Sequence, residues 1–72
     1  MISVTSTPAR AAAVLRQSPI PALRKLLVEE TEQAIVICGA VSSYYLKQLA
    51  QETLMPVLAG RELVNRVTVA QN

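Results

Sequence analysis

The sequence has no histidine, no tryptophan and no phenylalanine, and Cys38 is the one cysteine among its 72 residues. A lone thiol forms no intrachain disulfide, and without histidine it cannot build the common cysteine–histidine zinc sites. General acid–base and nucleophilic catalysis also lose their usual side chains. We therefore expect no catalytic residue, no metal site, no cofactor and no small-molecule substrate, and a core built from aliphatic side chains.

Long apolar runs and a cluster of basic residues are absent as well. No stretch approaches the roughly 20 apolar residues of a membrane-spanning helix, and the N-terminus lacks the charged and apolar regions of a secretory signal. Nucleic-acid-binding domains usually concentrate their basic residues in one stripe, whereas the seven in this chain are scattered and the net charge is only +2. The sequence therefore predicts a soluble, cytoplasmic protein that does not bind nucleic acid.

Hydrophobic residues make up 51% of the chain and charged residues 17%, which is typical of a folded domain rather than a disordered segment. With 72 residues the chain can hold one domain at most. We expect a disordered tail at 1–6 and a single domain at 7–71.

The N-terminal half of the domain predicts one helix and one strand. Thr7 is a suitable helix cap and Pro8 suits the first helical position, while the prolines within 18–21 end the helix. Residues 22–30 are ambiguous, because their local propensity favours a helix but their alternation also fits a strand. We interpret them as a strand, on the strength of the resemblance described below.

The C-terminal half predicts a strand, a helix and a strand. Residues 34–41 are β-branched, short and bounded by polar residues. Residues 42–55 follow a helical pattern capped by Ser42 or Ser43, and residues 61–71 alternate apolar with polar side chains. The order α-β-β-α-β predicts an α+β two-layer sandwich, with two helices on one face of a three-stranded mixed sheet. The pattern leaves open which of the other two strands pairs with the third.

Two segments resemble the BON domain, a family named after bacterial osmotically induced and nodulation proteins. The first, IVICGAVSSYYLKQLA, places Ile37, Gly39 and Val41 at the spacing of the family's Leu-x-Gly-x-Val. The second, GRELVNRVTV, matches the family's later motif at Gly60, Val64, Asn65 and Val67. The resemblance extends over residues 8–70, nearly the whole chain.

The resemblance implies an α-β-β-α-β fold, in agreement with the order above, and it favours a strand at 23–30. BON domains are non-catalytic modules that are often proposed to bind phospholipid. They recur in bacterial envelope and osmotic-stress proteins and are often periplasmic. No binding residue of the family is carried over onto this chain. The sequence departs from the family at Arg61, where valine is common, and at Pro56, so the end of the second helix is left open.

Three residues are expected to have structural roles. Gly39 closes the strand at 34–41, either because the chain needs a dihedral that only glycine tolerates or because a helix packs too closely for a Cβ. A single glycine is too little for a phosphate-binding loop. Gly60 precedes the last strand, and we expect Asn65 to bond to local backbone near the start of that strand.

Because the two helices cover one face of the sheet, the other face is expected to expose several apolar side chains together. The strand alternation assigns four apolar residues to this face, namely Leu27, Val36, Cys38 and Val64. Polar residues expected at its rim are Arg24, Arg66 and Thr68.

Contiguous exposed apolar surface usually marks an interaction site. Our first hypothesis is protein–protein association through this face, either as a homo-oligomer or by docking onto the rest of a larger protein. The alternative is peripheral binding to anionic phospholipid, although a net charge of +2 makes the electrostatic attraction weak. One of Tyr44 and Tyr45 is expected to pack at the edge of the core, and the exposed one would suit a membrane interface.

Overall fold

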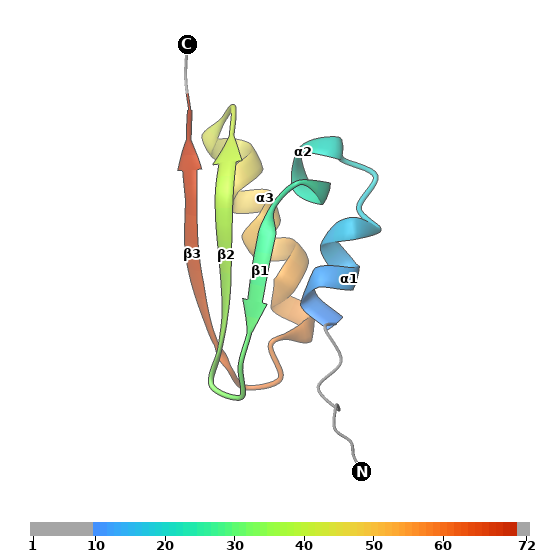
Figure 1. The fold of residues 1–72 in the computed structure, drawn as a ribbon, viewed down its shortest axis with the longest axis vertical. Helices are drawn as coiled ribbons and strands as arrows, with labels where there is room; N and C mark the ends of the chain where they lie inside the picture. The colour runs from blue at the N-terminus through green and yellow to red at the C-terminus, as the bar shows by residue number, and fades with distance from the viewer. Residues whose placement is uncertain (1–9, 71–72) are drawn as a thin grey trace.

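A computed structural model describes residues 10–70 as a sheet with helices layered behind it (Figure 1). The elements are α1 (Arg10–Arg16), α2 (Pro21–Arg24), β1 (Leu27–Glu30), β2 (Ala34–Val41), α3 (Tyr44–Leu54), the 3-10 helix η1 (Met55–Val57) and β3 (Glu62–Val69). The predicted tail at 1–6 and the predicted helix start at Thr7 and Pro8 lie outside the described residues.

The sheet has the strand order β1-β2-β3. β1 and β2 form an antiparallel hairpin, and β3 runs parallel to β2. Parallel neighbours cannot be joined by a tight turn, and α3 provides the longer crossover that they require. The predicted α+β class and mixed three-stranded sheet are confirmed, and β2 is identified as the strand that pairs with β3.

The core lies between the sheet and the helices. Successive side chains of a strand point to opposite faces, and in β2 this alternation buries Ile35, Ile37 and Val41. The helices contribute further apolar side chains that are almost completely buried, namely Ala11, Leu15, Leu23, Ala50 and Leu54. The core is therefore aliphatic, as the composition predicts.

The prediction of a strand over residues 22–30 is wrong for its first residues. Pro21–Arg24 forms the one-turn helix α2, and β1 begins only at Leu27. Proline fits the first turn of a helix because its φ is already helical and its missing N–H needs no partner there. This turn also buries Leu23. The start of the segment therefore follows its local helical propensity, and its end follows the strand alternation.

Helix α3 begins and ends as its sequence dictates. The Oγ of Ser43 accepts a hydrogen bond from the Leu46 N–H at 3.3 Å, so Ser43 rather than Ser42 is the cap. The α-helix ends at Leu54, and the chain tightens into η1, which contains Pro56. Because proline has no N–H to donate, it cannot continue the α-helical hydrogen bonding.

Gly39 and Gly60 both have positive φ, at +136° and +83°. A Cβ on Gly39 would lie 2.7 Å from the Cδ2 of Leu26, whereas a Cβ on Gly60 would have no atom within 4 Å. The dihedral requirement expected for Gly39 is therefore confirmed. The expected close approach of a helix is wrong, because the near atom belongs to the side chain of Leu26, the residue before β1. At Gly60 the backbone conformation alone favours glycine.

Candidate interaction face

The face of the sheet that points away from the helices is called the open face below. Figure 1 shows it toward the viewer, with the helices behind the strands. The strand register assigns to it Leu27 and Glu29 of β1, Ala34, Val36, Cys38 and Ala40 of β2, and Glu62, Val64, Arg66 and Thr68 of β3.

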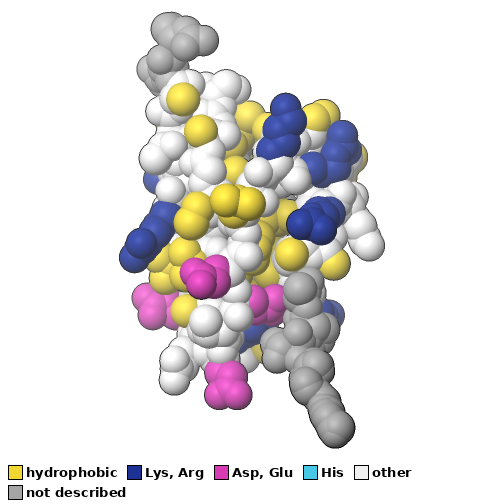
Figure 2. Space-filling model, viewed as in Figure 1, with side chains coloured by type: hydrophobic (Ala, Val, Ile, Leu, Met, Phe, Trp, Pro, Cys, Tyr) yellow, Lys and Arg dark blue, Asp and Glu magenta, His cyan; other side chains and the backbone are white. Residues whose placement is uncertain are grey.

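Apolar side chains cross the middle of the open face in two neighbouring rows. The rows are Leu27–Cys38–Arg66 and Glu29–Val36–Val64. Leu27 is 71% exposed, and the other apolar members of the rows are half-buried among their neighbours. Figure 2 shows hydrophobic side chains gathered along the middle of this face. The structure thus brings the four apolar candidates together, and their role in an interface stays a prediction.

Two of the three polar residues expected at the rim lie on the open face. Arg66 is exposed beside Cys38, and the Oγ1 of Thr68 donates a hydrogen bond to the Gly39 carbonyl at 3.0 Å. Arg24 lies off the sheet in α2, where its Nη1 donates to the Ser18 carbonyl at 2.9 Å. The displacement of Arg24 follows directly from the helical turn that replaces the first residues of the predicted strand.

Charge is divided along the length of the sheet. Four glutamates lie where the β1–β2 hairpin turns and β3 begins, namely Glu29, Glu30, Glu32 and Glu62. In Figure 2 the acidic side chains occupy the lower part of the view, and several Lys and Arg side chains lie above them. The open face therefore has an acidic end, and its other end lies near basic side chains.

The opposite end of the molecule, called the basic end below, is formed where β1 and α3 begin. It carries Arg24, Lys25, Leu27, Tyr44 and Tyr45. The expectation that one of the tyrosines packs at the core edge is wrong, because Tyr44 is 63% exposed and Tyr45 68% exposed. Leu46, in the first turn of the same helix, packs against the core, whereas neither tyrosine does.

Asn65 faces the helices and connects β3 to α3. Its Oδ1 accepts a hydrogen bond from the Val67 N–H at 3.1 Å, which confirms the expected bond to local backbone. Its Nδ2 donates to the Lys47 carbonyl at 3.1 Å and to the Gln51 Oε1 at 3.4 Å. The connection to α3 was not predicted, because the sequence pattern does not show which turn of the helix lies over this position.

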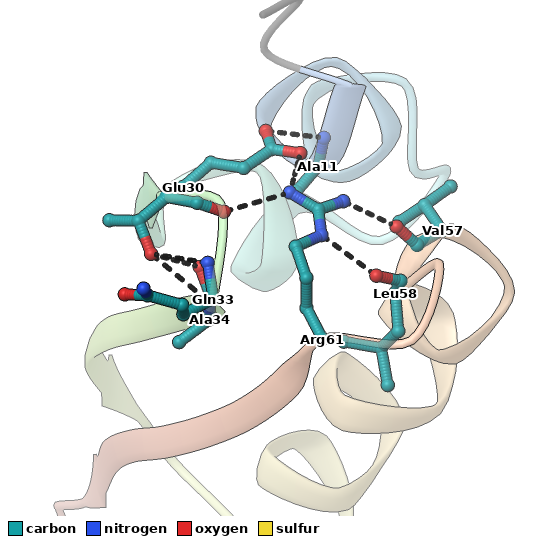
Figure 3. Close-up of polar contacts among 8 residues, drawn as sticks. Ala11, Glu30, Gln33, Ala34, Val57, Leu58 and Arg61 are labelled. Carbon is teal, nitrogen blue, oxygen red and sulfur yellow. Dashed lines mark hydrogen bonds and ion pairs between the residues drawn. The ribbon is translucent and has the colours of Figure 1, made fainter.

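Sequence reasoning also missed a polar cluster centred on Arg61, which is drawn in Figure 3. Arg61 Nη1 lies 2.9 Å from Glu30 Oε2, and its Nε and Nη2 donate to the carbonyls of Leu58 and Val57 at 2.7 and 2.8 Å. Glu30 Oε1 in turn accepts a hydrogen bond from the Ala11 N–H at 3.3 Å. The departure from the BON pattern at Arg61 was the one signal for this cluster in the sequence.

The described part of the chain contains no pocket and no group of three side chains suited to holding a metal ion. None of the helices between residues 10 and 70 has the length and hydropathy of a membrane span. The surface features that this structure offers for binding are apolar contact on the open face, charged groups at its two ends and the unpaired backbone of an edge strand. In comparisons with known proteins, no family model, curated protein or solved structure matches the chain.

Proposed function

We propose that this chain is a non-catalytic, BON-like interaction module that associates with protein surfaces through its open face. The supporting observation is the placement of Leu27, Val36, Cys38 and Val64 in adjacent rows of a sheet face that no described helix covers. Burial of the exposed Leu27 against a partner would stabilise a complex by about 1–2 kcal/mol. The half-buried residues around it would add shape complementarity.

The charges around this face define the kind of surface that it fits. Its apolar centre is bordered by Glu29 and Glu62 toward one end and by Arg66 toward the other. Protein interfaces commonly combine an apolar centre with a polar rim. A second copy of the chain presents such a surface, so self-association is the first case to test.

The variant Val36→Lys tests the face with little risk to the fold. Val36 lies directly opposite Glu29, so a lysine there gains an oppositely charged cross-strand neighbour. It also places a charge in the middle of the apolar rows. We expect Val36→Lys to weaken association in analytical ultracentrifugation. The matched control is Ala13→Lys, which adds the same charge at an exposed position of α1 and should change nothing.

Cys38 provides a second readout because it is the single cysteine and lies on the open face. If two copies cover this face, the rate of thiol modification should fall as protein concentration rises, and Val36→Lys should abolish that dependence. Association that is insensitive to Val36→Lys, with a Cys38 rate that is independent of concentration, would contradict contact between copies through the open face.

The basic end supports a second candidate function, peripheral binding to anionic phospholipid, which would fit the envelope and osmotic-stress roles of BON proteins. Exposed Leu27, Tyr44 and Tyr45 lie at the same end of the molecule as Arg24 and Lys25, which combines apolar anchors with positive charge.

Titration into phosphatidylglycerol vesicles and into phosphatidylcholine vesicles tests the lipid function. We expect binding to the anionic vesicles only, weakened by the double substitution Tyr44→Ser and Tyr45→Ser. The variant Met55→Ser is the control, because Met55 is 53% exposed but lies after the other end of α3. No binding to anionic vesicles at low salt would exclude this function.

A further inference from the structure

The outer edge of β3 has no partner among the described residues. β3 is last in the strand order, spans Glu62–Val69, and has no helix beyond it in Figure 1. The other edge strand, β1, is only Leu27–Glu30, and α1 packs against it. Long unpaired edges are templates for pairing with another strand, and proteins usually blunt them with short strands, charged side chains, proline or a bulge. β3 is eight residues long and contains neither proline nor glycine, and its charged residues are Glu62 and Arg66, of opposite sign.

The hydrogen bonds to β2 identify which backbone groups of β3 remain free. The N–H of Glu62 donates to the Gln33 carbonyl at 3.0 Å, and the N–H of Ala70 donates to the Val41 carbonyl at 2.8 Å. Even-numbered residues of β3 therefore direct their N–H and C=O toward β2. Because these directions alternate along a strand, the residues that face the free edge are Leu63, Asn65, Val67 and Val69.

One of these edge groups is already occupied. The N–H of Val67 donates to the Oδ1 of Asn65, so it is not free to pair with another strand. For the central pair, Leu63 and Asn65, no side chain between residues 10 and 70 accepts a hydrogen bond from either backbone N–H. A strand added to this edge would therefore form its hydrogen bonds around Val64, which lies between them.

The charges of β3 are arranged symmetrically about the same residue. Glu62 and Arg66 are both exposed on the open face, two residues before and two residues after Val64. Four residues of strand separate them by about 13 Å, so they cannot pair with each other within one chain. Neither has an ion-pair partner among residues 10–70.

We propose that two copies of the chain pair antiparallel along their β3 edges, with a two-fold axis at Val64. In this register Glu62 of each copy lies opposite Arg66 of the other, and Leu63 of each copy exchanges backbone hydrogen bonds with Asn65 of the other. The two sheets then form one continuous sheet, and the two open faces become one wider surface. This association uses the edge of the sheet, so it is independent of the proposed role of the open face.

The other symmetric registers are disfavoured by the same observations. An axis at Glu62 or at Arg66 would place like charges directly opposite each other. An axis at Asn65 would pair Leu63 with Val67, whose N–H is held by the Asn65 side chain. An axis at Leu63 would leave both Glu62 and Arg66 without an oppositely charged partner. Only the axis at Val64 satisfies the charges and the free backbone groups together.

The test is sedimentation equilibrium of the full chain carrying Val36→Lys, so that contact between open faces does not contribute. We expect a reversible dimer whose Kd rises about tenfold or more in Glu62→Arg and in Arg66→Glu, because each change places like charges across the axis twice. The double exchange of the two charges should restore the Kd to within about threefold. Glu52→Arg, at an exposed position of α3, makes the same change of charge as Glu62→Arg and should have no effect.

Amide hydrogen exchange provides an independent readout of the register. The amides of Leu63 and Asn65 should exchange more slowly as the dimer forms, while Cys38 on the open face stays reactive. A monomer at all concentrations would overturn the proposal, as would a dimer whose Kd is unchanged by the single charge reversals. A double exchange that fails to restore pairing would overturn the register. A dimer lost only through Val36→Lys would support the open face instead and contradict the edge.

Discussion

Arg61 and Glu30 lie 31 positions apart in the chain and form an ion pair, with the Arg61 Nη1 2.9 Å from the Glu30 Oε2. Both side chains are largely shielded from water. The pair joins the end of β1 to the turn before β3, and the other Glu30 oxygen accepts the N–H of Ala11 in α1. One arginine therefore connects segments that are distant in sequence, at the end of the sheet where the β1–β2 hairpin turns and β3 begins.

We expect Arg61→Met to lower the free energy of unfolding by about 2 kcal/mol, because it removes charge-assisted hydrogen bonds and leaves the Glu30 carboxylate without its partner. Arg61→Lys should recover little, since one ammonium group cannot reach Glu30 and the carbonyls of Val57 and Leu58 together. Urea denaturation measures both. Arg16→Met, which removes an exposed arginine of α1, is the control, and an equal loss of stability there would show that the change in net charge, rather than the ion pair, is responsible.

A second prediction separates the two glycines with positive φ. Gly39→Ala should destabilise the fold by about 2–3 kcal/mol, because the added Cβ meets both an unfavourable φ and the side chain of Leu26. Gly60→Ala should cost only about 1 kcal/mol, because nothing lies near its Cβ. Thermal or urea unfolding of the two variants compares them directly. Equal costs would mean that backbone conformation alone, rather than contact with Leu26, sets the requirement at Gly39.

A third prediction concerns the two halves of the Asn65 amide. Asn65→Asp retains an oxygen for the Val67 N–H but replaces the donor that binds the Lys47 carbonyl with a second acceptor. We expect it to destabilise the protein by about 1–3 kcal/mol while the Val67 amide keeps its protection from hydrogen exchange. Asn65→Ala should remove that protection as well. If Val67 exchanged equally in the two variants, its bond to Asn65 would not be what protects it.

The sequence pattern was sufficient for those parts of the fold that depend on local alternation. Residues 34–41 were predicted as a strand and β2 spans the same residues, because β-branched side chains and a single buried face agree there. It was insufficient for residues 22–30, where a proline starts a helical turn and the strand alternation starts only afterwards. A helical periodicity and a strand alternation that share nine residues cannot be told apart from the spacing of apolar residues alone.

The residues of the candidate face could also be predicted wherever they depend on strand alternation. Period-two alternation places Leu27, Val36, Cys38 and Val64 on one side of the sheet, and the observed register brings them into adjacent rows. Contacts between segments that are distant in the sequence could not be predicted in this way. The pairing of Arg61 with Glu30 depends on how the turn before β3 passes the end of β1, and alternation contains no information about that path.

The last prediction concerns the start of α3, where the sequence offered two caps. Only Ser43 accepts a hydrogen bond from the first turn of the helix, so Ser43→Ala should lower the free energy of unfolding by about 1 kcal/mol. Ser42→Ala is the matched control, since Ser42 is exposed, and it should change stability by no more than about 0.5 kcal/mol. Ser43→Asp should retain most of the stability, because its carboxylate accepts the same N–H and its charge favours the helix N-terminus. Urea denaturation measures the free energy of unfolding of the three variants. A larger loss of stability in Ser42→Ala than in Ser43→Ala would show that Ser42 caps the helix.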